Sequence, residues 1–216
     1  MEDPVEFNLP MVSQTQVNPA QDFTYAVALR SIMRQDPQVV MVGEIRDPET
    51  AAIAVQAGLT GHLVLSTIHS GVSAGAFTRL INMEIEPFML ASSILGVMGL
   101  RLVRRTCPNC MQAYEPEPSQ LKVVPEELVP KAQFRRGAGC DQCNQTGYSG
   151  RMPVSELLVV NEPFREAVLK KMPTAALEEI AIQQGMRTLW QNGLYSAIIG
   201  QTTLEETIRV LAASLL

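Results

Sequence analysis

Two short apolar runs in this chain of 216 residues lead into side chains that can do acid–base or phosphate chemistry. Residues 39–42 precede Glu44, and residues 63–68 precede His69. Runs this short, rich in β-branched residues and bounded by Pro or Gly, predict fully buried strands of a parallel sheet. Ligands of open α/β sheets bind beyond the carboxyl ends of the strands. We therefore expect a ligand site beside Glu44, Arg46, Asp47 and His69.

The two carboxylates at the first strand end have different interpretations. A carboxylate after a hydrophobic strand holds Mg²⁺ or orients a water in phosphoryl-transfer enzymes, and this is the role that we favour for Glu44. Asp47 is followed by Pro48-Glu49-Thr50, which reads as a first helical turn, so Asp47 can instead be the N-cap of that helix. His69 has a structural alternative as well, because a lone histidine usually packs in the fold.

All four cysteines belong to two Cys-x-x-Cys pairs, with 29 residues between the pairs. Four thiolates in two such turns complete the tetrahedral shell that Zn²⁺ prefers. Two disulfides or a redox pair are the alternatives, but no secretory signal is visible and a reducing compartment disfavours disulfides. We expect a structural Zn²⁺ site made of Cys107, Cys110, Cys140 and Cys143.

The order of elements predicts an α/β protein with three regions. In residues 1–104, strands at 39–45 and 62–68 alternate with helices at 19–33, 48–57, 72–83 and 87–104, as in a parallel sheet covered by helices. Residues 105–150 carry the cysteines among prolines and glycines. Residues 151–216 read as mainly helical, with Asn161 and Thr174 as N-caps, Gly185 as a helix stop and Thr203 to Glu206 as a capping box.

Composition narrows the class of protein. The chain has 46% hydrophobic residues, 18% charged residues and a net charge of -5, which is typical of a globular protein and argues against nucleic acid as the main partner. The longest apolar run, residues 87–100, is too short to span a bilayer. We expect no membrane-spanning segment.

Four blocks together resemble one family, the secretion ATPases of bacterial type II secretion and type IV pilus assembly. Residues 2–6 (Glu-Asp-Pro-Val-Glu) resemble its aspartate box, residues 34–47 its Walker B segment and residues 60–69 its histidine box. The cysteine pairs resemble its tetracysteine module, and residues 185–206 resemble its C-terminal helices. The blocks cover nearly the whole chain in the family's order. The chain departs from the family after His69, where Ser70-Gly71 replaces the usual Thr-Asn.

The resemblance implies a fold and roles for single residues. It implies the C-terminal part of a RecA-like P-loop NTPase core (1–104), a zinc-binding tetracysteine insertion (105–150) and a helical subdomain (151–216). It implies ATP with Mg²⁺ as the ligand, Glu6 orienting or deprotonating the attacking water with Glu2 and Asp3 in support, Glu44 acting through Mg²⁺, and His69 sensing the γ-phosphate. His62, Asp47, Arg30 and Arg34 are further nucleotide-side candidates. The two arginines lie one turn apart, where they either approach nucleotide or the next subunit or pair with Asp36 or Asp47.

The chain contains no P-loop sequence, because none of its lysines (Lys122, Lys131, Lys170, Lys171) follows a glycine. We expect a C-terminal piece of a longer ATPase that is inactive alone; a relative naturally without a P-loop is the alternative. The resemblance further implies a cytoplasmic homo-hexamer, peripheral to the bacterial inner membrane through platform and cytoplasmic-ring partners. Residues 14–18 and 85–88 favour the type II branch. The alternatives are a zinc-knuckle module that binds nucleic acid and a non-catalytic assembly module.

Overall fold

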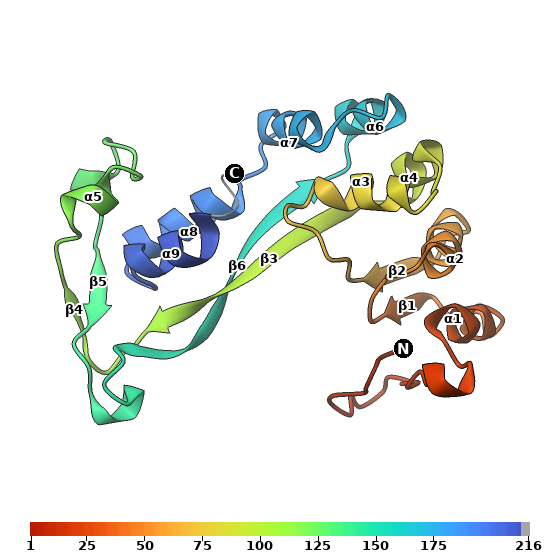
Figure 1. Cartoon of the computed structure of the whole chain (residues 1–216), viewed down its shortest axis with the longest axis horizontal. Coiled ribbons are helices and arrows are strands. Elements are labelled where there is room, and N and C mark those ends of the chain that lie inside the picture. Colours follow the sequence, from red (N-terminus) through yellow and green to blue (C-terminus); the bar gives the residue numbers. More distant parts are fainter. Residues whose placement is uncertain (213–216) are drawn as a thin grey trace. The chain divides into compact units, whose positions relative to one another are not determined.

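The structure, a computed structural model that describes residues 1–212, divides into two compact units. Unit 1 comprises residues 1–97 and 159–183, and unit 2 comprises residues 98–158 and the described residues from 184 on. Figure 1 shows the elements of both units along the ribbon. The chain therefore leaves unit 1 after residue 97, builds most of unit 2, and returns to add two helices to unit 1 before it enters unit 2 again at residue 184.

Unit 1 contains the predicted parallel strand pair. Strand β1 (Val39–Val42) pairs with β2 (Leu63–Ser66) in a register that joins Val39 to Leu63 and Val42 to Ser66. Helix α2 (Pro48–Leu59) connects the two strands and packs against β2. The prediction of a β-α-β unit is confirmed, although both strands end about two residues earlier than predicted.

Five further helices belong to unit 1. Helix α1 (Tyr25–Met33) follows the short 3₁₀ turn η1 (Pro19–Gln21) and begins at Thr24, whose side chain accepts a hydrogen bond from the Val27 amide. Asn161 caps α6 in the same way, as predicted. The phenyl rings of Phe77 and Phe164 pack edge to face at 5.0 Å between α3 and α6. The remaining bounds are α3 (Gly75–Asn82), α4 (Pro87–Ser93), α6 (Glu162–Leu169) and α7 (Thr174–Gln183).

One face of the β1–β2 sheet is open, so the prediction of fully buried strands is wrong for half of their side chains. Val40 and Val42 are buried. The side chains that alternate with them are between 44% and 56% exposed, because in this register they share the opposite face of the sheet; they are Val39, Met41, Leu63 and Leu65. Which apolar side chains of the two strands reach the core is therefore decided by the alternation of side chains along each strand, and not by apolar composition.

Unit 2 is built on a long ribbon of two strands, β3 (Gly96–Thr106) and β6 (Tyr148–Val159). A small antiparallel pair, β4 (Met111–Ala113) and β5 (Arg135–Gly137), belongs to the cysteine segment with α5 (Pro118–Leu121), η2 (Val129–Lys131) and η3 (Asp141–Cys143). Helices α8 (Leu189–Ile198) and α9 (Leu204–Leu211) complete the unit. Their apolar faces form one core with the ribbon, around Val103, Val154, Leu189 and Leu211.

Two helix predictions are wrong around this ribbon. The predicted helix 87–104 stops at Ser93, and the chain continues as β3. The region from residue 151, predicted to be mainly helical, begins with the last three-quarters of β6. At the end of α4, the Ser92 and Ser93 hydroxyls donate to carbonyls four residues earlier, and Ile94 is already extended. Pairing between two segments far apart in sequence then favours strand over helix in both of them.

A buried carboxylate joins α9 to β3. Glu206 has no exposed surface and accepts hydrogen bonds from the backbone amide and guanidinium of Arg104 and from the guanidinium of Arg209, at 2.7 to 3.0 Å. Thr203 caps α9 by accepting from the Glu206 amide, as predicted, but the Glu206 side chain is committed to the arginines. The predicted capping box is therefore only half formed.

Across residues 1–212, no helix combines the length and the apolar composition needed to cross a lipid bilayer. This agrees with the composition of the apolar run 87–100, which the structure divides between α4 and the start of β3.

We predict that Glu206→Gln lowers the free energy of unfolding by about 3 kcal/mol, the lower end for breaking a buried ion pair, since both arginines are partly exposed. Burial raises the pKa of Glu206, but the hydrogen bonds from Arg209 and Arg104 outweigh it and lower the pKa to about 2. A lowered carboxylate pKa stabilises the fold above the unfolded-state pKa, so this contribution should be lost as the pH falls from about 4.5 toward 2. Urea titrations at several pH values measure both effects.

Glu205→Gln is the matched control, because Glu205 is exposed on the same turn of α9. It should change the free energy of unfolding by no more than about 0.5 kcal/mol. Equal stability of Glu206→Gln and wild-type protein would show that the network contributes nothing to the fold.

Candidate functional site

The carboxyl ends of β1 and β2 bring the two predicted chemical groups together. Glu44 Oε2 lies 3.9 Å from His69 Nε2, and the guanidinium of Arg46 donates a hydrogen bond to the same carboxylate oxygen. The Glu44 side chain is mostly buried, whereas that of His69 is 82% exposed. The sheet therefore holds Glu44 in place and presents His69 to solvent.

Backbone pairing continues beyond both strands and holds this edge. The Ile45 amide donates to the Thr67 carbonyl at 2.9 Å, and the Thr67 hydroxyl donates to the Gly43 carbonyl at 2.7 Å. Glu44 therefore lies between two residues that are each tied to the end of β2. We did not predict that Thr67 would tie the ends of the two strands together, because a single threonine after an apolar run forms no recognisable sequence pattern.

The first two residues extend the sheet on the other side of β1. The Met1 amino group donates to the Met41 carbonyl at 2.8 Å, and the Gly43 amide donates to the Met1 carbonyl at 2.9 Å. Glu2 then forms a parallel bridge with Gln16. This pairing brings the acidic residues 2–6 to the strand that carries Glu44. Within them Glu2 is half-buried, while Asp3 and Glu6 are exposed.

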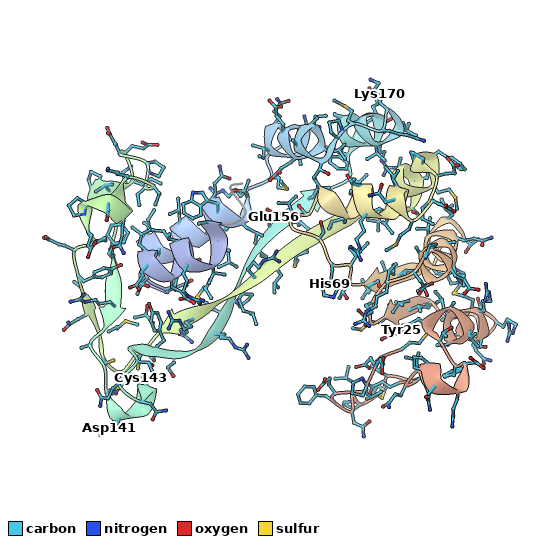
Figure 2. All side chains as sticks on the ribbon, viewed as in Figure 1. Tyr25, His69, Asp141, Cys143, Glu156 and Lys170 are labelled. Atoms are coloured by element: carbon cyan, nitrogen blue, oxygen red, sulfur yellow. The ribbon has the colours of Figure 1, made fainter. Side chains whose placement is uncertain are left out.

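Tyr25 is a residue of this site that the sequence analysis missed. A Cβ atom on Gly43 would lie 2.8 Å from the Tyr25 hydroxyl and 3.1 Å from the Met1 carbonyl oxygen, so glycine allows both groups to approach the backbone there closely. Burial raises the pKa of Tyr25, and the negative charges of Glu44 and Asp3 raise it further. Figure 2 labels Tyr25 at the start of α1, near β1, and His69 in the loop that follows β2. The only feature of the sequence that could have pointed to Tyr25 is its place in the first turn of the helix before β1.

The remaining nucleotide-side candidates have local partners. Arg30 forms an ion pair with Glu49 at 2.7 Å, instead of with Asp36 or Asp47, and Arg34 donates to the Ser31 hydroxyl at 3.3 Å. Both arginines are exposed, so these contacts are weak. They leave the guanidinium groups accessible at the end of α1.

Asp47 and His62 lie at opposite ends of α2. Asp47 is the N-cap, with one carboxylate oxygen 2.8 Å from the Thr50 amide and the other 2.8 Å from the Thr50 hydroxyl. The His62 ring lies 3.2 Å from the Ala57 carbonyl oxygen at the C-terminal end of the helix. Because His62 precedes β2, it lies at the amino end of the strands, away from Glu44 and His69.

The four cysteines form a compact cluster in unit 2. All four are free thiols, and their sulfur atoms lie within 4.8 Å of one another. Three of the sulfur–sulfur distances are 3.9, 3.9 and 3.7 Å. A tetrahedral zinc site with Zn–S bonds of about 2.3 Å requires sulfur–sulfur distances of about 3.8 Å. The donor set and spacing therefore fit one tetrahedral metal ion.

Nitrogen donors beside Cys140 and Cys143 favour the thiolate forms of these two cysteines. The Cys140 sulfur accepts a hydrogen bond from the Asn109 side chain at 3.3 Å, and this bond is the main cause that lowers the pKa of Cys140 to about 6. The Cys143 sulfur accepts from the backbone amides of Cys140 and Gly147, at 3.3 Å each. Gly137 and Gly147 touch so closely that a Cβ on Gly137 would lie 2.2 Å from the Gly147 carbonyl oxygen. Glycine at both positions therefore lets the two cysteine turns approach.

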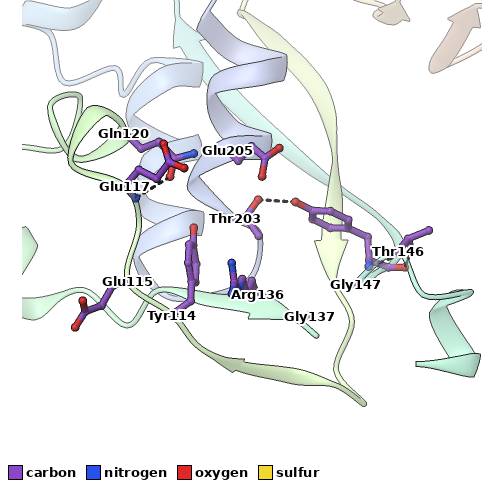
Figure 3. Close-up of a pocket in the computed structure, with 11 residues that line it drawn as sticks. Tyr114, Glu115, Glu117, Gln120, Arg136, Gly137, Thr146, Gly147, Thr203 and Glu205 are labelled. Atoms are coloured by element: carbon purple, nitrogen blue, oxygen red, sulfur yellow. Dashed lines mark hydrogen bonds between the residues drawn. The ribbon is translucent and has the colours of Figure 1, made fainter. Parts of the chain in front are cut away.

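A pocket of about 250 Å³ lies beside the cysteine cluster (Figure 3). The Tyr148 hydroxyl meets the Thr203 hydroxyl at 2.6 Å in its wall, and the Arg136 guanidinium lies over the Tyr114 ring at 5.5 Å. Its other charged lining groups are three carboxylates, Glu115, Glu117 and Glu205. This mixture of charges does not select one class of ligand, and no sequence motif marks the pocket.

Comparison with known proteins agrees with the order of the motifs. The family model described as "Type II/IV secretion system protein" matches residues 1–209. The chain is 47% identical over 210 residues to the type IV pilus assembly ATPase PilB of Thermus thermophilus, covering 96% of this chain and 24% of that protein. It is 49% identical over 210 residues to the type II secretion system protein E of Aeromonas hydrophila, covering 97% and 42%.

The type II secretion system ATPase E of Vibrio cholerae is 47% identical over 210 residues, again covering 97% of this chain and 42% of the relative. The chain thus spans less than half of the length of these relatives. Among solved structures, the pilus retraction motor PilT with bound ADP superimposes with a TM-score of 0.65 at 23% identity, covering 96% of this chain and 50% of that one. The Legionella pneumophila ATPase DotB gives 0.63 at 19% identity, with 96% and 50% covered. These two likenesses describe the fold.

Proposed function

The chain belongs to the family of type II/IV secretion system proteins, and from that premise we propose that it works in a hexameric ATPase that powers type II protein secretion or type IV pilus assembly. The observation that carries this proposal is the meeting of Glu44 and His69 at the carboxyl ends of β1 and β2, where Met1 also pairs with β1 and so starts the acidic segment 2–6 beside that strand. We retain the motif-based division into a partial RecA-like core (1–104), a tetracysteine module (105–150) and a helical subdomain (151–216).

The carboxylates are assigned to the cation and the attacking water. Glu44 would hold Mg²⁺, directly or through its water shell, and the cation would offset the charge on the phosphates. The Arg46 side chain that now contacts Glu44 is 68% exposed, so their ion pair costs little to break. Glu6 would orient or deprotonate the water, with Glu2 and Asp3 in support.

The basic groups are assigned to the phosphates. His69 would donate a hydrogen bond to the γ-phosphate, since its exposed ring follows β2 beside Glu44. Arg30 and Arg34 would supply positive charge to nucleotide at a subunit boundary. Asp47 and His62 remain nucleotide-side candidates on the family resemblance, beside the capping roles that they already have. Platform and ring proteins at the cytoplasmic side of the inner membrane are the proposed partners.

Nucleic-acid binding is less well supported. The rings near the cysteine cluster that would stack on bases are Tyr114 and Tyr148. The guanidinium of Arg136 lies over the first ring at 5.5 Å, and that of Arg104 lies over the second at 4.1 Å. Arg104 is also held by Glu206. These intramolecular contacts compete with stacked bases.

We predict negligible ATP hydrolysis by the 216 residues alone, since they contain no P-loop sequence to surround the phosphates. A chimera in which this chain replaces the matching 210 residues of the Vibrio cholerae ATPase should hydrolyse ATP with Mg²⁺. Glu44→Gln in the chimera should reduce kcat by at least about 100-fold. Exposed Glu84→Gln should leave kcat unchanged. Hydrolysis that survives Glu44→Gln would contradict the assigned role.

We predict that His69→Ala in the same chimera lowers kcat roughly 10- to 150-fold with little change in ADP affinity, the scale of one lost hydrogen bond to a charged phosphate. Because the His69 side chain is 82% exposed, the melting temperature should stay near that of the unsubstituted chimera. Wild-type kinetics with a collapsed melting temperature would instead mean that His69 packs the fold.

We predict one structural Zn²⁺ per chain, which elemental analysis of protein purified without chelator measures directly. Cys140→Ser should lose the metal and make residues 105–150 more sensitive to protease, because a bound metal supplies much of the folding energy of such a segment. Gln142→Ser, an exposed change inside the same turn, is the control and should keep both properties. Zinc-free wild-type protein, or a mass that reports two disulfides, would refute the assignment.

A further inference from the structure

Residues 2–6 bring three carboxylates together on a segment with little packing of its own. Glu2, Asp3 and Glu6 lie within five positions, and their like charges repel one another. Beyond them, residues 6–13 are all exposed. Only Met1 and Glu2 are paired to the rest of unit 1 by backbone hydrogen bonds, through β1 and Thr15. These few backbone hydrogen bonds do not fix residues 3–9, so side-chain contacts must hold the acidic turn in one position.

The Gln14 side chain supplies three of them. Its Nε2 atom donates to Glu2 Oε1 at 2.7 Å and to the Phe7 carbonyl oxygen at 2.9 Å. Its Oε1 atom accepts from the Leu9 amide at 2.8 Å. One amide thus joins the carboxylate at the start of the turn to the backbone at its far end.

Gln16 makes a smaller contribution of the same kind. Its Oε1 atom accepts a hydrogen bond from the Val5 amide at 3.2 Å. The two glutamines differ in which side-chain atoms they use. Gln14 uses both its donor and its acceptor, whereas the bond from Gln16 to the turn uses only the acceptor.

An amide suits this position for an electrostatic reason. A lysine or arginine at residue 14 would neutralise the carboxylate that it holds and compete with a bound cation. An amide N–H restrains Glu2 through a single hydrogen bond and leaves the negative charge in place. The Glu2 carboxylate is therefore held in position and keeps its negative charge.

We propose that Gln14 is a positioning residue of the active site, which holds the Glu2 carboxylate and the 2–9 segment beside the strand end that carries Glu44. This inference rests on the proposed function, in which Glu2 and Glu6 serve the attacking water. Gln14 itself need not touch the nucleotide. It acts through Glu2 and through the backbone of the turn.

Three substitutions that nearly preserve side-chain size test the inference. Gln14→Glu keeps the acceptor for the Leu9 amide but removes both N–H donations and sets a second carboxylate against Glu2. Gln16→Glu adds the same charge nearby and keeps the acceptor that Val5 uses, so it is the matched control. Gln14→Leu removes donor and acceptor without adding charge, and separates the loss of hydrogen bonds from repulsion.

The first measurement is amide hydrogen exchange in the 216-residue chain, which requires no ATP. Gln14→Glu and Gln14→Leu should accelerate exchange in residues 2–9 by roughly 10-fold, with no change in β1, β2 or unit 2. Gln16→Glu should have an effect below about twofold. Unchanged exchange in both Gln14 variants, or acceleration spread over the whole of unit 1, would overturn the inference.

The second measurement is steady-state kinetics in the Vibrio cholerae chimera. Both Gln14 variants should lower kcat by about 10-fold while KM for ATP stays within about twofold, because only the groups that act on the water move. Wild-type kcat in Gln14→Leu, or an equal loss in Gln16→Glu, contradicts the positioning role. A chimera with the unsubstituted chain that fails to hydrolyse ATP would refute the proposed function instead, and hydrogen exchange would still decide the restraint by Gln14.

Discussion

The parallel alignment of β1 and β2 is the constraint on which the candidate site depends. Because both strands point the same way in one register, their carboxyl ends meet at one edge and set Glu44 beside His69. A slip of one residue would reverse which side chains face the core, so the burial of Val40 and Val42 also specifies the position of Glu44. The bonds from Thr67 continue this alignment beyond the strands.

The two units hold negative charge in two different ways. Glu206 is fully buried, and guanidinium groups neutralise it, which suits a carboxylate that only joins α9 to β3. Glu2 is half-buried and is restrained by an uncharged amide, so its charge stays available at the sheet edge. The carboxylate that we propose to serve the ligand and the carboxylate that joins α9 to β3 thus differ in their partners and not in their residue type.

The cysteine cluster depends on backbone geometry as much as on its thiols. Gly137 and Gly147 allow the two turns to touch, and amide groups point at the sulfur of Cys143. These contacts lie within unit 2 and involve none of the residues at the β1–β2 edge. Loss of the proposed Zn²⁺ should therefore leave the local geometry of Glu44 and His69 unchanged.

The sequence alone determined the order of motifs, the β1-α2-β2 unit, the caps at Asp47 and Asn161 and the grouping of the four cysteines, because each is written in residues that are near one another in the chain. Only the tertiary structure decided that residues 96–106 and 148–159 are strands, because a ribbon of two distant segments leaves no local signal strong enough to exclude helix. The same holds for Tyr25, Thr67 and Gln14. Thr67 acts through the continued pairing of β1 and β2, whereas Tyr25 and Gln14 act through contacts with Met1, Glu2 and the residues beside them, and side-chain type and spacing do not record these contacts.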